Sequence, residues 1–147
     1  CMDSVEDADS VIAIGGGSVL DIAKGAAALA GTGATARDYF AGRAVPETGR
    51  PLIALPTTSG TGSEVTWVSV LVEKETRRKA SIRGGGMMPA VAIVDPELTV
   101  SCPPSVTAYS GMDAFVQAVE SFTSRGANPM TDGLSLQAAK LAARWLE

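Results

Sequence analysis

Residues 52–66, with the sequence LIALPTTSGTGSEVT, constrain the fold of this chain more than any other stretch. The stretch begins with four apolar residues, which is typical of a short buried strand. Pro56 ends this run, because proline cannot donate a hydrogen bond to a strand ladder. The hydroxyl and glycine residues that follow are small, so their backbone can lie close to a polar ligand. The alternative is an ordinary Gly/Ser/Thr loop.

A second glycine-rich turn, Gly15-Gly16-Gly17-Ser18, lies between an expected strand at 11–14 and an expected helix at 19–30. We expect Ser18 to be the N-cap, with Asp21 as its capping-box partner. A strand, a glycine turn and a helix N-terminus together form a phosphate site. The alternative is a tight turn that only needs positive φ, because the turn matches neither GxGxxG nor a Walker A loop. We expect this turn and the loop after Pro56 to converge on one anion site.

Three short apolar strands, separated by a helix and loops, favour an α/β sheet. The third is expected at 90–94, and 65–72 with 79–82 predict a hairpin with a polar tip. One helical turn is expected at 37–40, with Arg37 and Asp38 as a solvated pair. The strand at 11–14 has no visible first partner, so we expect further sheet upstream.

The pattern becomes helical from Ser105 onward, and Asn128-Pro129 separates a second helix at 131–146. Two helices are too few for an independent core. We therefore expect two parts: a partial α/β dinucleotide-binding domain over 1–101 and the start of a helical domain over 102–147.

Composition excludes several classes of protein. The chain of 147 residues is 46% hydrophobic, which argues against disorder, and its net charge of −4 offers no basic surface for nucleic acid. No apolar run approaches the roughly 20 residues of a membrane span. The two cysteines and the absence of a signal peptide predict a cytoplasmic protein. There is no histidine, so the chain contains no Ser-His-Asp triad and no histidine base.

Asp113 and Gln117, in the motif GMDAFVQAVESF, share one face of the expected helix. They would supply two oxygen donors for a metal or a polar substrate. The alternative is a buried polar pair that caps neighbouring loops.

Four motifs in this order, GGGSVLDIAK, LPTTSGTGSEVT, VDPELT and GMDAFVQAVES, resemble the iron-containing (group III) alcohol dehydrogenase family over about residues 8–146. The resemblance implies a Rossmann-like nucleotide-binding α/β domain followed by an all-helical domain, in the dehydroquinate synthase-like arrangement, with the active site between them. Family members interconvert alcohols and aldehydes or ketones with NAD or NADP, usually with Fe²⁺ and sometimes with Zn²⁺.

The resemblance also implies roles for individual residues. The glycine turn would face the cofactor pyrophosphate, and the second loop would lie beside the ribose and phosphates. Two further residues match positions near the nicotinamide. The implied cofactor-binding residues are Gly16, Gly17, Ser18, Thr57, Thr58, Thr61, Thr66 and Lys79. Asp113 matches the aspartate metal ligand, and Gln117 stands where most metal-dependent members carry a histidine.

The resemblance covers the middle of a dehydrogenase. The expected function is therefore NAD(P)-dependent oxidation of a small alcohol, or reduction of an aldehyde, by a longer enzyme. The alternative is a non-catalytic remnant or interaction module with at most weak nucleotide binding. We expect the chain by itself to be inactive, to bind neither nucleic acid nor membrane, and to form a homo-oligomer through exposed strand edges and apolar surface.

Overall fold

The computed structural model describes residues 5–73 and 75–146, which form two compact units. The first unit contains the chain up to Thr57 and Ser63–Leu98, and the second contains Thr58–Gly62 and the chain from Thr99. The first unit is α/β and the second is helical, so the predicted fold class is confirmed. The division into domains 1–101 and 102–147 stays a prediction.

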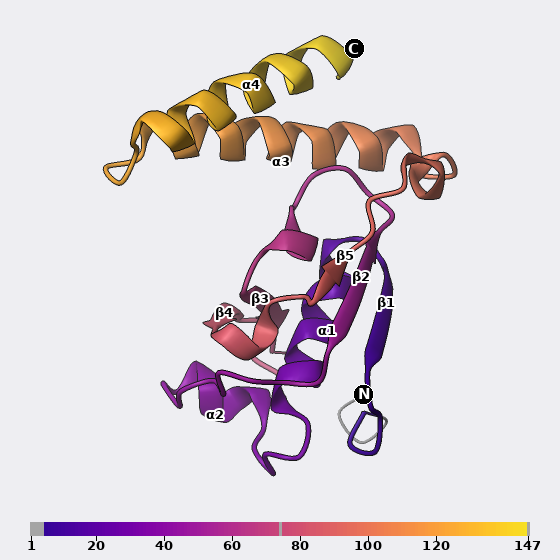
Figure 1. Ribbon diagram of the computed structural model, residues 1–147, viewed down its shortest axis with the longest axis vertical. Coiled ribbons are helices and arrows are strands. Elements are labelled where there is room, and N and C mark those ends of the chain that lie inside the picture. The colour runs from indigo at the N-terminus through magenta and orange to yellow at the C-terminus, as the bar shows by residue number, and fades with distance from the viewer. Residues whose placement is uncertain (1–4, 74, 147) are drawn as a thin grey trace. The chain divides into compact units, whose positions relative to one another are not determined.

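The first unit is built on a parallel sheet in the order β1-β2-β5 (Figure 1). β1 (Val11–Gly15) and β2 (Leu52–Pro56) pair over their full length, with Gly15 opposite Pro56. Pro56 is thus the last residue of its strand, where the loss of one donor costs least. β5 is only Val91–Ala92 and is exposed, so the expected buried strand at 90–94 is shorter and less covered than predicted.

Helix α1 (Gly17–Leu29) follows β1 directly and covers one face of this sheet (Figure 1). Its Leu20 and Ala27 pack in a buried cluster with the inward-facing residues of β1 and β2: Ala13, Leu52 and Ala54. Alternate strand residues point the other way. Ile12 and Ile14 are accordingly 64% and 58% exposed.

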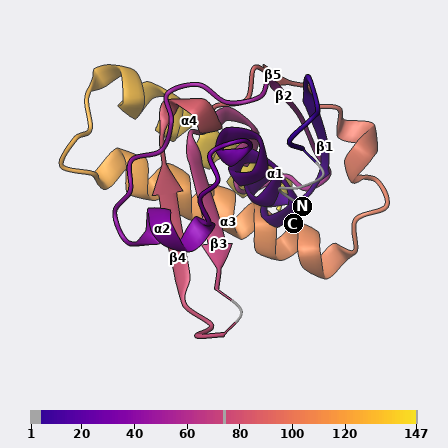
Figure 2. The same cartoon turned by 90° about the horizontal axis from the view of Figure 1, so that it is seen from below.

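An antiparallel hairpin, β3 (Val68–Val72) and β4 (Lys79–Arg83), also packs against α1 (Figure 2). The predicted hairpin is confirmed, although its first strand starts later than expected because Ser63–Val65 form a 3-10 turn, η1. Two further 3-10 turns, η2 (Gly85–Met87) and η3 (Pro96–Thr99), flank β5. A second buried cluster joins α1 to the hairpin and to the residues around it: Ala28, Leu29, Ala34, Tyr39, Ile82 and Met87.

The short helix α2 (Ala36–Phe40) begins at a capping box formed by Thr35 and Asp38. The Asp38 carboxylate accepts hydrogen bonds from the amide and the hydroxyl of Thr35, and these bonds lower the pKa of Asp38. Arg37 forms ion pairs with Glu73 and Glu75 beyond β3. The expected Arg37–Asp38 pair is therefore wrong, because each side chain has a better-placed partner.

Lys24 of α1 is completely buried, which is rare for a lysine. Its ammonium donates to the carbonyl and the hydroxyl oxygen of Ser63, at 2.8 and 2.9 Å, and to Oγ1 of Thr66 at 3.0 Å. The Asp21 carboxylate lies 3.5 Å away as the counter-ion. Burial lowers the pKa of Lys24, while Asp21 and Glu64 act in the opposite direction.

The second unit is a helical hairpin of α3 (Pro104–Thr123) and α4 (Pro129–Trp145). Asn128 is the N-cap of α4 and accepts hydrogen bonds from the amides of Met130 and Thr131. Pro129 follows as the first helical residue, a position that tolerates proline because its amide would have no partner. The predicted helix break at this dipeptide is thus the start of α4.

Within the described residues, no helix has the length and apolar character that crossing a membrane requires.

We predict that the free energy of unfolding rises with pH below about 10.5 because of Lys24. Its folded-state pKa is lower than the ordinary value of 10.5, so in this window the unfolded chain binds more protons than the folded chain. Stability then increases as pH rises from the folded pKa towards 10.5. Urea unfolding of the wild-type chain and of Lys24→Met, followed by circular dichroism from pH 7 to 10.5, measures this. An equal pH slope in the two proteins would contradict it.

Candidate functional site

The glycine turn between β1 and α1 is shaped by close packing. Gly16, and not Ser18, is the N-cap of α1, and no side chain caps the helix, so the predicted capping box of Ser18 and Asp21 is wrong. Gly16 has φ −72° and ψ 177°, which any residue can adopt. A Cβ on Gly15 would lie 2.6 Å from the Cβ of Val19, so Gly15 allows the helix to start immediately after the strand. Among the described residues, positive φ occurs only outside this turn, at Gly31, Gly33, Gly42, Gly62 and Arg77.

The N-terminus of α1 offers unpaired backbone donors. The amides of Val19 and Leu20 bond the carbonyl of Gly16, at 2.9 and 3.1 Å, while helix geometry leaves the amides of Gly17 and Ser18 without an intrahelical acceptor. The first turn contains no acidic side chain. Free amides and the positive end of the helix dipole favour an anion at this position.

The structure brings Thr57 next to this turn. Its amide donates to the carbonyl of Gly15 at 3.0 Å, because β1 and β2 are parallel and end at the same edge of the sheet. Small residues that follow two adjacent parallel strands therefore meet at one edge, which is where open α/β sheets bind ligands.

Thr58 and Thr61 belong to the second unit, so their approach to the glycine turn stays a prediction. In this loop a Cβ on Gly60 would lie 2.7 Å from the Cβ of Ser110 on α3. The small size of Gly60 is thus needed for packing against α3. Gly62 adopts the left-handed φ of 64°, as expected for a glycine that turns the chain.

Thr66 and Lys79, the two residues matched to the nicotinamide half, both lie in the first unit. Thr66 is half-buried and its hydroxyl accepts a hydrogen bond from Lys24. Lys79 is exposed at the start of β4, opposite Val72.

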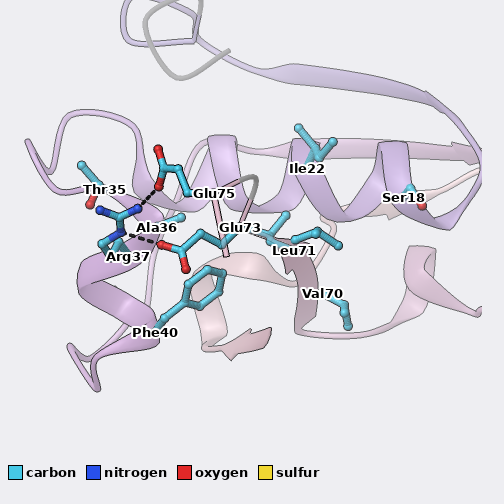
Figure 3. Close-up of a pocket in the computed structure, with 11 residues that line it drawn as sticks. Ser18, Ile22, Thr35, Ala36, Arg37, Phe40, Val70, Leu71, Glu73 and Glu75 are labelled. Atoms are coloured by element: carbon cyan, nitrogen blue, oxygen red, sulfur yellow. Dashed lines mark hydrogen bonds and ion pairs between the residues drawn. The ribbon is translucent and has the colours of Figure 1, made fainter. Parts of the chain in front are cut away.

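Ser18 lines a surface cavity of about 610 Å³ between α1, α2 and β3 (Figure 3). Ile22, Val70 and Leu71 give the part of the cavity near Ser18 an apolar wall. Arg37 lies at the opposite end and is paired with Glu73 and Glu75 (Figure 3). These carboxylates raise the pKa of Arg37, so its charge is already compensated.

The predicted metal-ligand pair, Asp113 and Gln117, is exposed on α3, so the alternative of a buried polar pair is wrong. The amide nitrogen of Gln117 donates to the Asp113 carboxylate at 2.7 Å. Within the described part of the chain, no three His, Cys, Asp or Glu residues come together as a metal site. Fe²⁺ and Zn²⁺ sites in catalysis need about three protein ligands, so the residues present do not fit a catalytic metal.

Sequence reasoning missed the group formed by the buried Lys24 and Ser63 with the partly buried Asp21. Asp21 accepts from Oγ of Ser63 at 2.6 Å and from the amide of Val70 at 3.1 Å. One signal was available in the sequence, namely a lysine within the almost wholly apolar helix at 19–30.

Comparison with known proteins assigns the chain to a family. Residues 4–96 match the model for iron-containing alcohol dehydrogenase, and residues 107–147 match the model for the C-terminal part of the same family. The chain is 48% identical over 141 residues to long-chain-alcohol dehydrogenase 1 of Geobacillus thermodenitrificans, covering 94% of this chain and 35% of that protein. It is 39% identical to the NAD-dependent methanol dehydrogenase of Bacillus methanolicus, covering 96% of this chain and 37% of that protein.

A solved structure is also similar. Sulfoacetaldehyde reductase from Bifidobacterium kashiwanohense, in complex with NAD⁺, matches with a TM-score of 0.94 and 47% identity, covering 99% of this chain and 40% of that one. The chain thus spans little more than a third of the length of these relatives. Because the family models match both its α/β part and its helical part, this chain belongs to the iron-containing alcohol dehydrogenase family.

Proposed function

We propose that this chain forms the pyrophosphate-binding part of an NAD(P)-dependent oxidoreductase that interconverts a small alcohol and its aldehyde or ketone. The observation that carries the proposal is the junction of β1 and α1. There an uncapped helix N-terminus with free amides at Gly17 and Ser18 lies beside the end of a neighbouring parallel strand.

Three further observations support this function. The relatives include an NAD-dependent methanol dehydrogenase and a sulfoacetaldehyde reductase solved with NAD⁺. The backbone amide of Thr57 donates to the carbonyl of Gly15, so Thr57 follows β2 directly beside the glycine turn. The cavity that begins at Ser18 has an apolar wall, which suits a cofactor whose phosphates join two riboses that carry aromatic bases.

The residues of this chain would bind and orient the cofactor. The Gly17 and Ser18 amides would donate to phosphate oxygens, and the Ser18 hydroxyl would add a further donor. Thr58, Thr61, Thr66 and Lys79 are proposed to contact the rest of the cofactor. When bound, the nicotinamide accepts or donates the hydride.

The residues that would stabilise the alkoxide are incomplete in this chain. Asp113 and Gln117 supply two oxygen donors at most, and the sequence contains no histidine. We therefore assign this chain to cofactor binding, and we assign alcohol oxidation to the longer protein of which its relatives are examples.

We predict that Gly16→Val weakens NADH binding at least about tenfold, because a side chain at the N-cap would prevent close approach of the phosphates. Valine can adopt the extended backbone of Gly16, so the variant should still fold. Titration with NADH, followed by its fluorescence, measures the dissociation constant.

Gly126→Val is the matched control, since its added side chain would meet only Ser124, at an ordinary distance. Unchanged affinity in Gly16→Val, with circular dichroism like that of the wild type, would exclude the proposed phosphate site.

We also predict that the purified chain shows no saturable binding of Fe²⁺ or Zn²⁺ at micromolar concentrations and no NAD⁺-dependent alcohol oxidation. Two oxygen donors leave most of the coordination shell to water, so the metal would not be held in a fixed geometry. Anaerobic equilibrium dialysis and the absorbance of NADH with a panel of small alcohols test this. Turnover by the wild type that disappears in Asp113→Ala would show instead that the site is complete.

A further inference from the structure

We propose that Gly60 and Ser110 are positioning residues, which join the loop of residues 58–62 to helix α3 and so transmit cofactor binding to Asp113. The inference rests on the proposed function, because it takes Thr58 and Thr61 of this loop to contact the cofactor. It adds to that function a physical link between the loop and the helix that carries the predicted metal pair.

The loop belongs to the helical unit, although the residues on both sides of it belong to the α/β unit. Residues 58–62 are part of the second unit, whereas Thr57 and Ser63 are part of the first. The amide of Thr57 donates to the carbonyl of Gly15, and both oxygens of Ser63 accept from Lys24. Both ends of the loop are thus held by hydrogen bonds within the first unit, whereas its middle packs within the second.

Gly60 is the point at which the loop lies against α3. A Cβ on Gly60 would lie 2.7 Å from the Cβ of Ser110 and 2.8 Å from its carbonyl carbon. Cβ atoms in proteins do not come this close to a backbone, so a side chain here would displace the loop or the helix. The backbone of Gly60 lies outside the left-handed region, so its close approach to α3, and not its own φ, requires glycine.

The contact lies one helical turn before the predicted metal pair. Ser110 precedes Asp113 by three residues on α3, and residues three apart are neighbours on a helix surface. Asp113 in turn accepts a hydrogen bond from the side-chain amide of Gln117 at 2.7 Å. A helix is a stiff element, because its backbone is hydrogen-bonded along its length. A displacement of the loop that moves Ser110 therefore also moves Asp113 and Gln117.

The alternative is that the contact only packs the loop, and this alternative predicts a different response to the cofactor. If the contact serves packing alone, NADH slows hydrogen exchange in the loop and leaves α3 unchanged. If the contact joins the two elements, the slowing extends from the loop into the first turns of α3. The difference can be measured in this chain without any catalytic activity.

Two disruptive variants and two controls of the purified chain form the test. Gly60→Ala places a Cβ against the backbone of α3, and Ser110→Val enlarges the other side of the same contact. Ser110→Ala is a control that keeps the Cβ facing Gly60. Gly133→Ala is the matched glycine control, since a Cβ on this exposed residue of α4 would meet nothing within 4 Å.

Hydrogen exchange measured by mass spectrometry, with and without NADH, is the readout. In the wild type and both controls we expect NADH to slow exchange about fivefold or more over residues 58–62 and 106–113. In the two disruptive variants we expect the slowing over 106–113 to disappear. Without NADH, residues 58–62 of these variants should exchange about tenfold faster than in the wild type. Their dissociation constant for NADH should rise about fivefold, because the loop is no longer held in place.

Undiminished slowing over 106–113 in the disruptive variants would overturn the inference. Slowing confined to the loop in the wild type would also overturn it, because the contact would then serve packing alone. Urea unfolding reports any loss of stability, and Ser110→Val keeps the test decisive if Gly60→Ala does not fold. A wild-type chain that does not bind NADH would instead refute the proposed function. Exchange over 58–62 without cofactor would then still decide whether Gly60 holds the loop on α3, and wild-type rates there in the disruptive variants would show that it does not.

Discussion

The first unit depends on helix α1 being buried on two sides. Its small and apolar residues pack on one side against β1 and β2, and on the other against the hairpin of β3 and β4. A helix enclosed in this way has little room for large side chains, which explains the alanines at 26–28. The helix also starts directly at the sheet edge, because Gly15 has no Cβ to meet Val19. The packing of α1 thus places its N-terminus, with the free amides, directly at the end of β1.

The same burial accounts for the unusual polar contacts of the unit. A charged lysine in the middle of α1 must find partners inside the protein, because an unpaired buried ammonium is strongly destabilising. The partners come from a segment about forty residues further along the chain. The η1 turn and the start of β3 are therefore both joined by hydrogen bonds to the helix that follows the glycine turn.

The two site regions differ in how complete they are. The proposed phosphate position has its backbone donors in place and a cavity beside Ser18. The predicted metal pair, Asp113 and Gln117, offers two oxygen ligands. The side-chain amide of Gln117 donates a hydrogen bond to the Asp113 carboxylate. In this chain, which covers little more than a third of its relatives' length, the proposed phosphate position is thus more complete than the predicted metal pair.

The sequence by itself determined the strand–glycine turn–helix order, the hairpin, the two long helices and the family, since these depend on local periodicity, on glycine and proline, and on motifs read along the chain. It did not determine the cap of α1, because whether Gly16 or Ser18 starts the helix depends on how closely the helix packs on β1. It also did not reveal the partners of Asp21 and Lys24. Nor did it reveal that Ser110 leaves no room for a side chain at Gly60. Those contacts join residues that are far apart in the chain, so only the tertiary structure could decide them.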